Sequence, residues 1–177
     1  AIVDVEIKNL QKMGVKFITD CIIGKTISVK DLEEQGFKGI FVGSGAGLPN
    51  FMNIPGENAL NIMSSNEYLT RVNLMDAANP HSDTPINLGK KVVVVGGGNT
   101  AMDTARAAKR NAGVEKVSLV YRRTRRYMPA DEEELVMAIE DGVEFAELLS
   151  PVRQENGVLI CKKMVLGDID ASGRRGV

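Results

Sequence analysis

The stretch KVVVVGGGNTAMDTARAAKR, residues 91–110, decides the fold of this chain. Four consecutive valines predict a buried strand over 91–95, and the residues from Asn99 to Asn111 predict a helix. The glycines between them fit the pattern G-x-G-x-x-A, with Ala101 in the last position. A strand, a glycine turn and a helix in this order are typical of a dinucleotide-binding unit.

Each position of the turn has a physical reason in such a unit. Gly96 allows the tight turn out of the strand, Gly98 leaves room for a pyrophosphate beside the backbone, and Ala101 lets the helix pack close. The helix start also offers unpaired N–H groups and the positive end of its dipole to phosphates. The predicted cofactor-binding residues of the turn are Gly96, Gly97, Gly98, Asn99 and Thr100. A tight turn without a ligand is the alternative.

The end of the next predicted strand, residues 116–121, indicates which dinucleotide binds. NAD-specific units have a carboxylate about 20 residues beyond the glycines, which binds the ribose 2′-OH. Here Tyr121 is followed by Arg122 and Arg123, with Arg125 and Arg126 close behind. Guanidinium groups bind a 2′-phosphate through hydrogen bonds worth about 1.5–3 kcal/mol each. We therefore predict that Arg122 and Arg123 bind NADPH, with a solvated basic loop as the alternative.

The remaining patterns predict an α/β fold. Strands are also expected over 15–19, 39–45, 143–149 and 158–166, and helices over 2–13, 29–35, 65–77 and 131–141. Residues 79–90 contain two prolines and are the best linker candidate. The order β-α-β-α-β-β in the second half predicts a Rossmann-like, three-layer dinucleotide-binding domain with mainly parallel strands.

Composition excludes several classes of protein. The chain has 177 residues, 44% of them hydrophobic, and a net charge of −1, which argues against disorder and against a nucleic-acid partner. Two distant cysteines, Cys21 and Cys161, and a single histidine, His81, exclude a zinc site and a dithiol redox pair. No apolar run is long enough to span a membrane. We expect reduced, buried thiols in a cytoplasmic protein that binds no metal.

The motifs together resemble a known family. The segments GKKVVVVGGGNTAMDTARAAKR, VSLVYRRTRRYMPADEEE and EDGVEF are similar to the small (beta) subunit of NADPH-dependent glutamate synthase. They also resemble related flavoprotein electron-input modules, such as sulfide dehydrogenase and ferredoxin–NADP oxidoreductase subunits. FVGSGAGLPNFMNIPGEN and SSNEYLTRVNL fit the same pattern, so the resemblance covers about residues 3–175.

The resemblance implies an FAD domain interrupted by an NADPH domain. On that layout, residues 1–48 are a partial FAD-domain segment, and residues 49–90 are a connecting helix and linker. Residues 91–177 are the NADPH-binding domain without its closing strand. The family's glycine motif for FAD and its cysteine-rich region are missing from the sequence. We therefore expect a fragment that is inactive on its own.

The resemblance also implies a function. In the intact protein, hydride passes from NADPH to FAD, and electrons continue to iron–sulfur clusters there or in a large catalytic or electron-accepting partner subunit. Direct hydride transfer requires no acid or base, so no catalytic side chain is predicted. Two alternatives remain open: a non-catalytic scaffold or docking domain, and another NADPH-dependent electron-input module.

Overall fold

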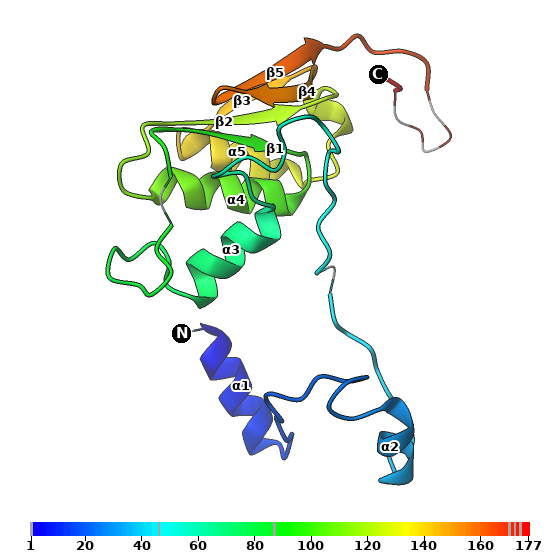
Figure 1. The fold of residues 1–177 in the computed structure, drawn as a ribbon. Helices are drawn as coiled ribbons and strands as arrows, with labels where there is room; N and C mark the ends of the chain where they lie inside the picture. Colours follow the sequence, from blue (N-terminus) through cyan, green and yellow to red (C-terminus); the bar gives the residue numbers. More distant parts are fainter. Residues whose placement is uncertain (1, 46, 87, 170, 172, 174) are drawn as a thin grey trace. The chain divides into compact units, whose positions relative to one another are not determined.

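The computed structural model describes residues 2–45, 47–86, 88–169, 171, 173 and 175–177. The chain divides into two compact units, Ala1–Gly45 and Ala46–Val177. The first unit holds the helices α1 (Ile2–Lys12) and α2 (Val29–Glu34) (Figure 1). The expected capping box starts α2, because Asp31 N donates to Ser28 Oγ over 3.1 Å and Ser28 N donates to Asp31 Oδ2 over 2.8 Å.

The two strands expected in the first unit do not form, and those predictions are wrong. Residues 15–19 and 39–45 have no regular secondary structure, and the side chain of Phe41 is almost fully exposed. A strand is stable only when a neighbouring strand takes up its backbone hydrogen bonds. In the described part of this unit, the bridge between Ile23 and Ile27 is the extent of such pairing. An apolar, β-branched run is therefore not sufficient here.

A three-stranded parallel sheet forms the centre of the second unit. Its strands, in spatial order, are β1 (Lys91–Val95), β2 (Lys116–Tyr121) and β3 (Glu144–Glu147). Val94 lies beside Leu119 in the β1–β2 register, and Leu119 lies beside Phe145 in the β2–β3 register. The predicted parallel arrangement is confirmed, with β2 in the middle.

Helices cover one face of this sheet. They are α3 (Ser65–Leu74), α4 (Asn99–Arg110) and α5 (Glu132–Glu140), with α4 and α5 against the sheet and α3 packed on α4 (Figure 1). Met102 on α4, Leu119 on β2 and Leu135 on α5 are almost completely buried between these layers. The buried alanines of α4, such as Ala105 and Ala108, allow the close approach of helix and sheet.

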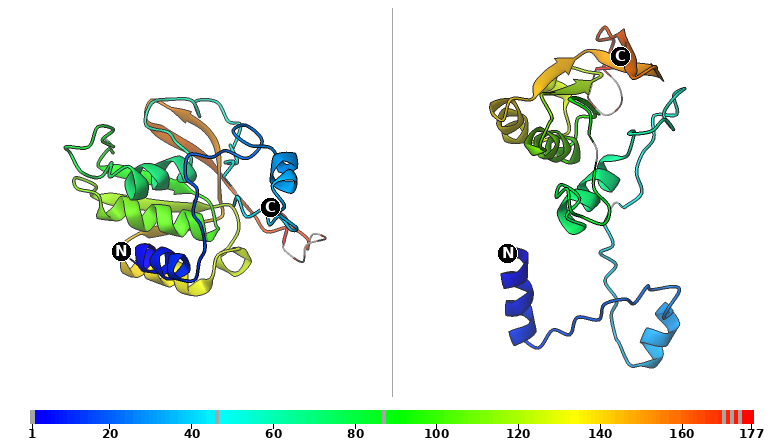
Figure 2. Two further views of the ribbon diagram at one scale, coloured as in Figure 1. Left: turned by 90° about the horizontal axis from the view of Figure 1, so that it is seen from below. Right: turned by 60° about the vertical axis from the view of Figure 1, so that its left-hand side comes forward.

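The third layer is a β-hairpin, of which the sequence predicted the second strand but not the first. β4 (Leu149–Glu155) and β5 (Val158–Lys163) pair antiparallel on the sheet face opposite α4 and α5 (Figures 1 and 2). The strand expected over 143–149 is interrupted, because Leu148 has a positive φ of 57°. A left-handed residue ends the extended backbone of β3 and starts a new strand.

Smaller differences concern helix ends and thiols. α3 begins after its predicted cap, Ser64, whose Oγ accepts from Glu67 N over 3.1 Å, but it ends at Leu74, three residues earlier than expected. Cys21 and Cys161 are free, as expected, but both are only half-buried rather than buried. In the part of the chain that the structure describes, no helix has the length and apolar character needed to cross a bilayer.

An ion-pair cluster joins α4 to α5. Asp141 Oδ2 accepts from Arg106 Nε and from Arg110 Nη2, each over 2.8 Å. Glu134 Oε2 lies 3.6 Å from Arg106 Nη1. The hydrogen bond from Arg106 is the main reason that the pKa of Asp141 lies below its ordinary value.

This depressed pKa predicts a pH-dependent loss of stability. Asp141 stabilises the folded state when ionised, so its contribution is complete above the ordinary aspartate pKa of about 3.9 and disappears as the pH falls through the lower folded-state pKa. We expect Asp141→Asn to unfold at lower urea concentration than the wild type at pH 7, and the two curves to converge in acid. The exposed neighbour Glu140, changed to Gln, is the control. A gap between wild type and Asp141→Asn that persists in acid would contradict this origin.

Candidate functional site

The residues 96–100, called the glycine turn below, connect β1 to α4. Gly96 has a positive φ of 152°, and its N–H donates to Val120 O over 3.1 Å. A Cβ at Gly96 would lie 3.1 Å from Cβ of Ala101. Both positions therefore need small residues, which is the reason the sequence pattern predicts for them.

Gly97 is fixed by packing that the sequence did not reveal. A Cβ at Gly97 would lie 2.4 Å from Cε2 of Tyr121, because the tyrosine ring at the end of β2 covers this glycine. The hydroxyl of Tyr121 donates to Tyr127 O over 2.7 Å, and Gly97 O accepts from Ala130 N over 2.9 Å. The glycine turn is thus attached to residues 122–130, called the arginine turn below.

Gly98 is the position where the glycine turn is open. It is the N-cap of α4, with ordinary extended dihedral angles and no side chain to cap the first amides. A Cβ at Gly98 would meet no atom within 4 Å. Uncapped amides facing open space at a helix start are the features that bind a phosphate or another anion.

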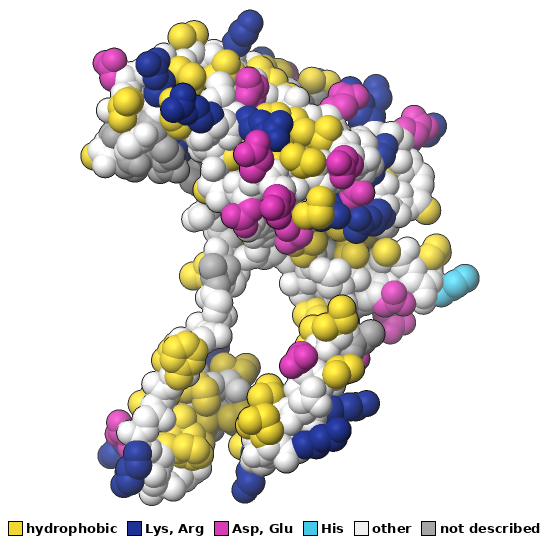
Figure 3. All heavy atoms as spheres, turned by 180° about the vertical axis from the view of Figure 1, so that it is seen from behind, with side chains coloured by type: hydrophobic (Ala, Val, Ile, Leu, Met, Phe, Trp, Pro, Cys, Tyr) yellow, Lys and Arg dark blue, Asp and Glu magenta, His cyan; other side chains and the backbone are white. Residues whose placement is uncertain are grey.

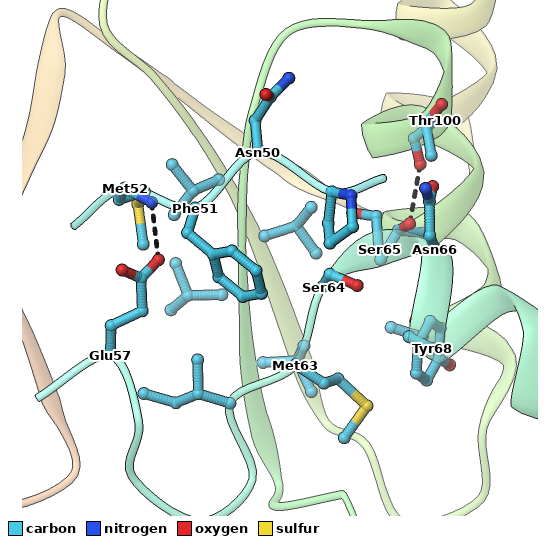
Figure 4. Close-up of a pocket in the computed structure, with 18 of the residues that line it drawn as sticks. Asn50, Phe51, Met52, Glu57, Met63, Ser64, Ser65, Asn66, Tyr68 and Thr100 are labelled. Atoms are coloured by element: carbon cyan, nitrogen blue, oxygen red, sulfur yellow. Dashed lines mark hydrogen bonds between the residues drawn. The ribbon is translucent and has the colours of Figure 1, made fainter. Parts of the chain in front are cut away.

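The next two residues are exposed and face different neighbours. Asn99 exchanges two hydrogen bonds with Asp131, the residue before α5: Asn99 Nδ2 donates to Asp131 Oδ2 and Asp131 N donates to Asn99 Oδ1, each over 3.0 Å. Thr100 accepts at its carbonyl oxygen from Thr104 Oγ1 over 2.7 Å (Figure 4). Both side chains lie at the positive end of α4, as the sequence predicts.

The four arginines after β2 have different environments. Arg122 is exposed directly beyond Tyr121. Arg123 is buried, and its Nε donates to Arg175 O over 2.7 Å. Arg125 Nη2 donates to Glu132 Oε1 over 3.0 Å, while the guanidinium of exposed Arg126 lies 5.9 Å from the ring centroid of Tyr127. At the end of β2, Arg122 therefore has an exposed side chain that, within the described residues, is not held by contacts like those of the other three arginines.

A cavity of about 460 Å³ runs along β1, and none of its described lining residues belongs to β2 or β3. Phe51 and Met63 contribute apolar surface, and Asn50, Ser65 and Thr100 contribute polar groups (Figure 4). No sequence pattern predicted this cavity.

Three hydrogen bonds hold the cavity wall at residues 48–57 in place. The Glu57 carboxylate accepts from Met52 N (Figure 4) and from Asn53 N, each over 2.7 Å. Pro55 O accepts from Gln154 N of β4 over 2.8 Å, and a Cβ at Gly56 would lie 2.2 Å from Gln154 O. Glycine is therefore required where this wall meets the hairpin.

Over the described ranges, no group of three or more His, Cys, Asp or Glu residues is placed to hold an ion. The chemistry of the donors at the glycine turn is that of anion binding, with backbone amides and an exposed guanidinium.

Comparison with known proteins gives a family match. Residues 3–154 match the model of the family described as pyridine nucleotide-disulphide oxidoreductase. The chain is 41% identical to the putative oxidoreductase YgfK of Escherichia coli and 39% identical to the NADPH-Fe(3+) oxidoreductase subunit beta of Geobacter sulfurreducens. It is 32% identical to the glutamate synthase [NADPH] small chain of Azospirillum brasilense, which confirms the resemblance seen in the sequence.

These matches cover most of this chain but only part of each relative. The shares are 92% of the chain and 15% of YgfK, 96% and 25% for the Geobacter protein, and 99% and 38% for the Azospirillum protein. Among solved structures, FprA of Mycobacterium tuberculosis in complex with NADPH has a TM-score of 0.68 at 19% identity, over 89% of this chain and 49% of FprA. That likeness confirms the Rossmann-like fold.

Substitution by alanine should affect stability differently at the neighbouring positions Gly97 and Gly98. Gly97→Ala should destabilise the protein by about 1–3 kcal/mol, because the added methyl group overlaps the Tyr121 ring. Gly98→Ala should change stability by less than about 1 kcal/mol, because its Cβ enters open space and its dihedral angles suit alanine. Urea unfolding of both variants measures the difference. Equal destabilisation would contradict the packing described for Gly97.

Proposed function

Because the chain belongs to the pyridine nucleotide-disulphide oxidoreductase family, we propose that it is the NADPH-binding portion of a flavoprotein oxidoreductase. The observation that carries the proposal is the open N-cap at Gly98, which follows the parallel strand β1 and begins the helix α4. In this proposal the pyrophosphate of NADPH binds to the glycine turn, at the amides of Gly98, Asn99 and Thr100. Backbone amides and the helix dipole supply the attraction for its two negative charges.

The arginine turn selects NADPH over NADH in this proposal. Arg122 is exposed at the carboxyl end of β2, the strand next to β1, so it is available to the 2′-phosphate of a dinucleotide that crosses the sheet edge there. Arg123, predicted to share this role, is buried with its Nε on Arg175 O. We assign the direct contact with the 2′-phosphate mainly to Arg122. Arg123 would instead support the neighbouring backbone through its hydrogen bond to Arg175 O.

The nicotinamide end then extends toward the cavity along β1. The cavity reaches Val95, directly before the glycine turn, and Thr100, the last residue of that turn. NADPH supplies a hydride to a flavin when both are bound. The contribution of this chain is to bind and orient the dinucleotide, and no side chain is assigned an acid or base role.

The intact protein adds the remaining components. Relatives are named as small or beta chains of larger oxidoreductases, which supports a partner subunit that accepts electrons. FAD, and iron–sulfur clusters in the protein or its partner, belong to this proposal. The proposal also divides the chain into three segments. Residues 1–48 are a partial FAD-domain segment, residues 49–90 a connecting helix and linker, and residues 91–177 the NADPH-binding domain. Free thiols at Cys21 and Cys161 support a cytoplasmic location.

The electron acceptor distinguishes the two closest alternatives. A relative named glutamate synthase small chain favours a glutamate synthase, whereas one named NADPH-Fe(3+) oxidoreductase subunit beta favours another electron-input module. Both need the same NADPH site. Identification of the partner that co-purifies with the intact protein separates them, whereas a scaffold function predicts no dinucleotide binding.

Gly98→Val tests the pyrophosphate site. The side chain would enter the open space at the helix start and exclude the phosphates, so binding of NADPH and NADH should both fall below detection. The extended dihedral angles at this position suit valine, so the fold should remain. Titration of nicotinamide fluorescence, with circular dichroism for the fold, measures both. Retained binding in a folded variant would contradict the site.

Arg122→Asp tests the 2′-phosphate site. Loss of a charge-assisted contact should weaken NADPH binding about 10- to 100-fold. The affinity for NADH, which lacks the 2′-phosphate, should change less than about threefold. Arg153→Asp makes the same charge change on the exposed hairpin and serves as control. If Arg122→Asp weakens both dinucleotides equally, the guanidinium does not select the cofactor.

A further inference from the structure

We propose that Asp131 is a positioning residue that determines specificity for NADPH, an inference that rests on the function proposed above. Through its two hydrogen bonds with Asn99, it holds the arginine turn against the glycine turn. The 2′-phosphate and the pyrophosphate then meet binding groups at a fixed separation. The pair Asn99–Asp131 is called the latch below.

The Asp131 side chain does not make the contact that its position predicts. Asp131 is the N-cap of α5, where an aspartate normally accepts a hydrogen bond from an amide of its own helix. Here the carboxylate makes no such bond and accepts from Asn99 Nδ2 instead. A favourable local contact is thus replaced by one that joins two turns 32 residues apart in sequence.

The latch completes the attachment of the arginine turn. Near its start, the hydroxyl of Tyr121 bonds to Tyr127 O, and Arg125 N donates to Glu147 Oε2 over 2.9 Å. At its end, Ala130 N bonds to Gly97 O, and the latch follows one residue later. A ligand that touches both turns loses less entropy on binding when their spacing is fixed beforehand.

The charge of Asp131 does not favour dinucleotide binding. Asp131 lies beside the start of α4, where the proposal places phosphates, so its negative charge opposes binding of either dinucleotide. Any benefit from Asp131 must therefore come from its hydrogen bonds rather than its charge. Variants that remove the charge but differ in hydrogen bonding separate these two effects.

Asp131→Asn and Asp131→Ala make that comparison. Both are uncharged, but asparagine keeps an oxygen that accepts from Asn99 Nδ2. In the intact protein, we expect Asp131→Asn to keep at least the wild-type ratio of NADPH to NADH affinity. Asp131→Ala should lower that ratio about five- to tenfold, as expected for one lost hydrogen bond. Equal ratios in the two variants would overturn the inference.

Two further variants exclude a merely structural or electrostatic effect. If Asp131 acts through Asn99, adding Asp131→Ala to Asn99→Ala should lower the ratio no further, whereas additive losses would count against the latch. Glu133→Gln removes an exposed carboxylate from the same helix start and should leave the ratio within about twofold. A loss in Glu133→Gln as large as that in Asp131→Ala would assign the effect to helix charge.

The outcome for the wild type separates this inference from the proposed function. A wild-type protein that binds neither dinucleotide, or binds both equally, contradicts the proposed function and the latch together. A wild type that prefers NADPH, with equal ratios in Asp131→Asn and Asp131→Ala, overturns the latch alone. Asn99, Asp131 and Glu133 are all exposed, so all variants are expected to remain folded, which circular dichroism measures.

Discussion

The close approach of α4 to the parallel sheet is the constraint on which the second unit depends. A Cβ at Gly96 would lie only 3.1 Å from Cβ of Ala101. Further along α4, the buried Ala105 and Ala108 also let the helix lie close to the sheet. A larger residue at either end of the turn would lift the helix start from β1. The open N-cap at Gly98 would then no longer lie at the carboxyl edge of the sheet. The packing of α4 and the proposed anion site thus have the same structural cause.

Sequence patterns predicted this region well because its interactions are local or repeat along the chain. The valines of β1, the glycines of the turn and the small residues of α4 each follow from a rule that acts within a few positions. The failures have the opposite character. Residues 15–19 and 39–45 look like strands but lack a partner strand in the described part of their unit, and β4 was hidden because Leu148 reverses its backbone dihedral.

The proposed binding residues also differ in how far the sequence could predict them. The glycine turn was visible in the sequence, and so was the absence of a carboxylate after β2. The different environments of Arg122 and Arg123 were not visible, because the burial of Arg123 depends on a contact with Arg175, 52 residues away. The pairing of Asn99 with Asp131, the Tyr121 ring over Gly97 and the cavity along β1 also join distant segments. Patterns of residue type indicate which groups are present, and tertiary contacts decide which of them meet a ligand.

The contact between Gly56 and Gln154 has a mechanical consequence for the cavity. The wall formed by residues 48–57 is attached to the β-hairpin through Pro55, whereas the opposite wall belongs to β1 and α4. The position of the hairpin therefore helps to set where this wall lies relative to β1. The space beside β1 is thus shaped in part by a hairpin whose described residues do not line it, in a molecule that carries both charged and apolar side chains on its surface (Figure 3).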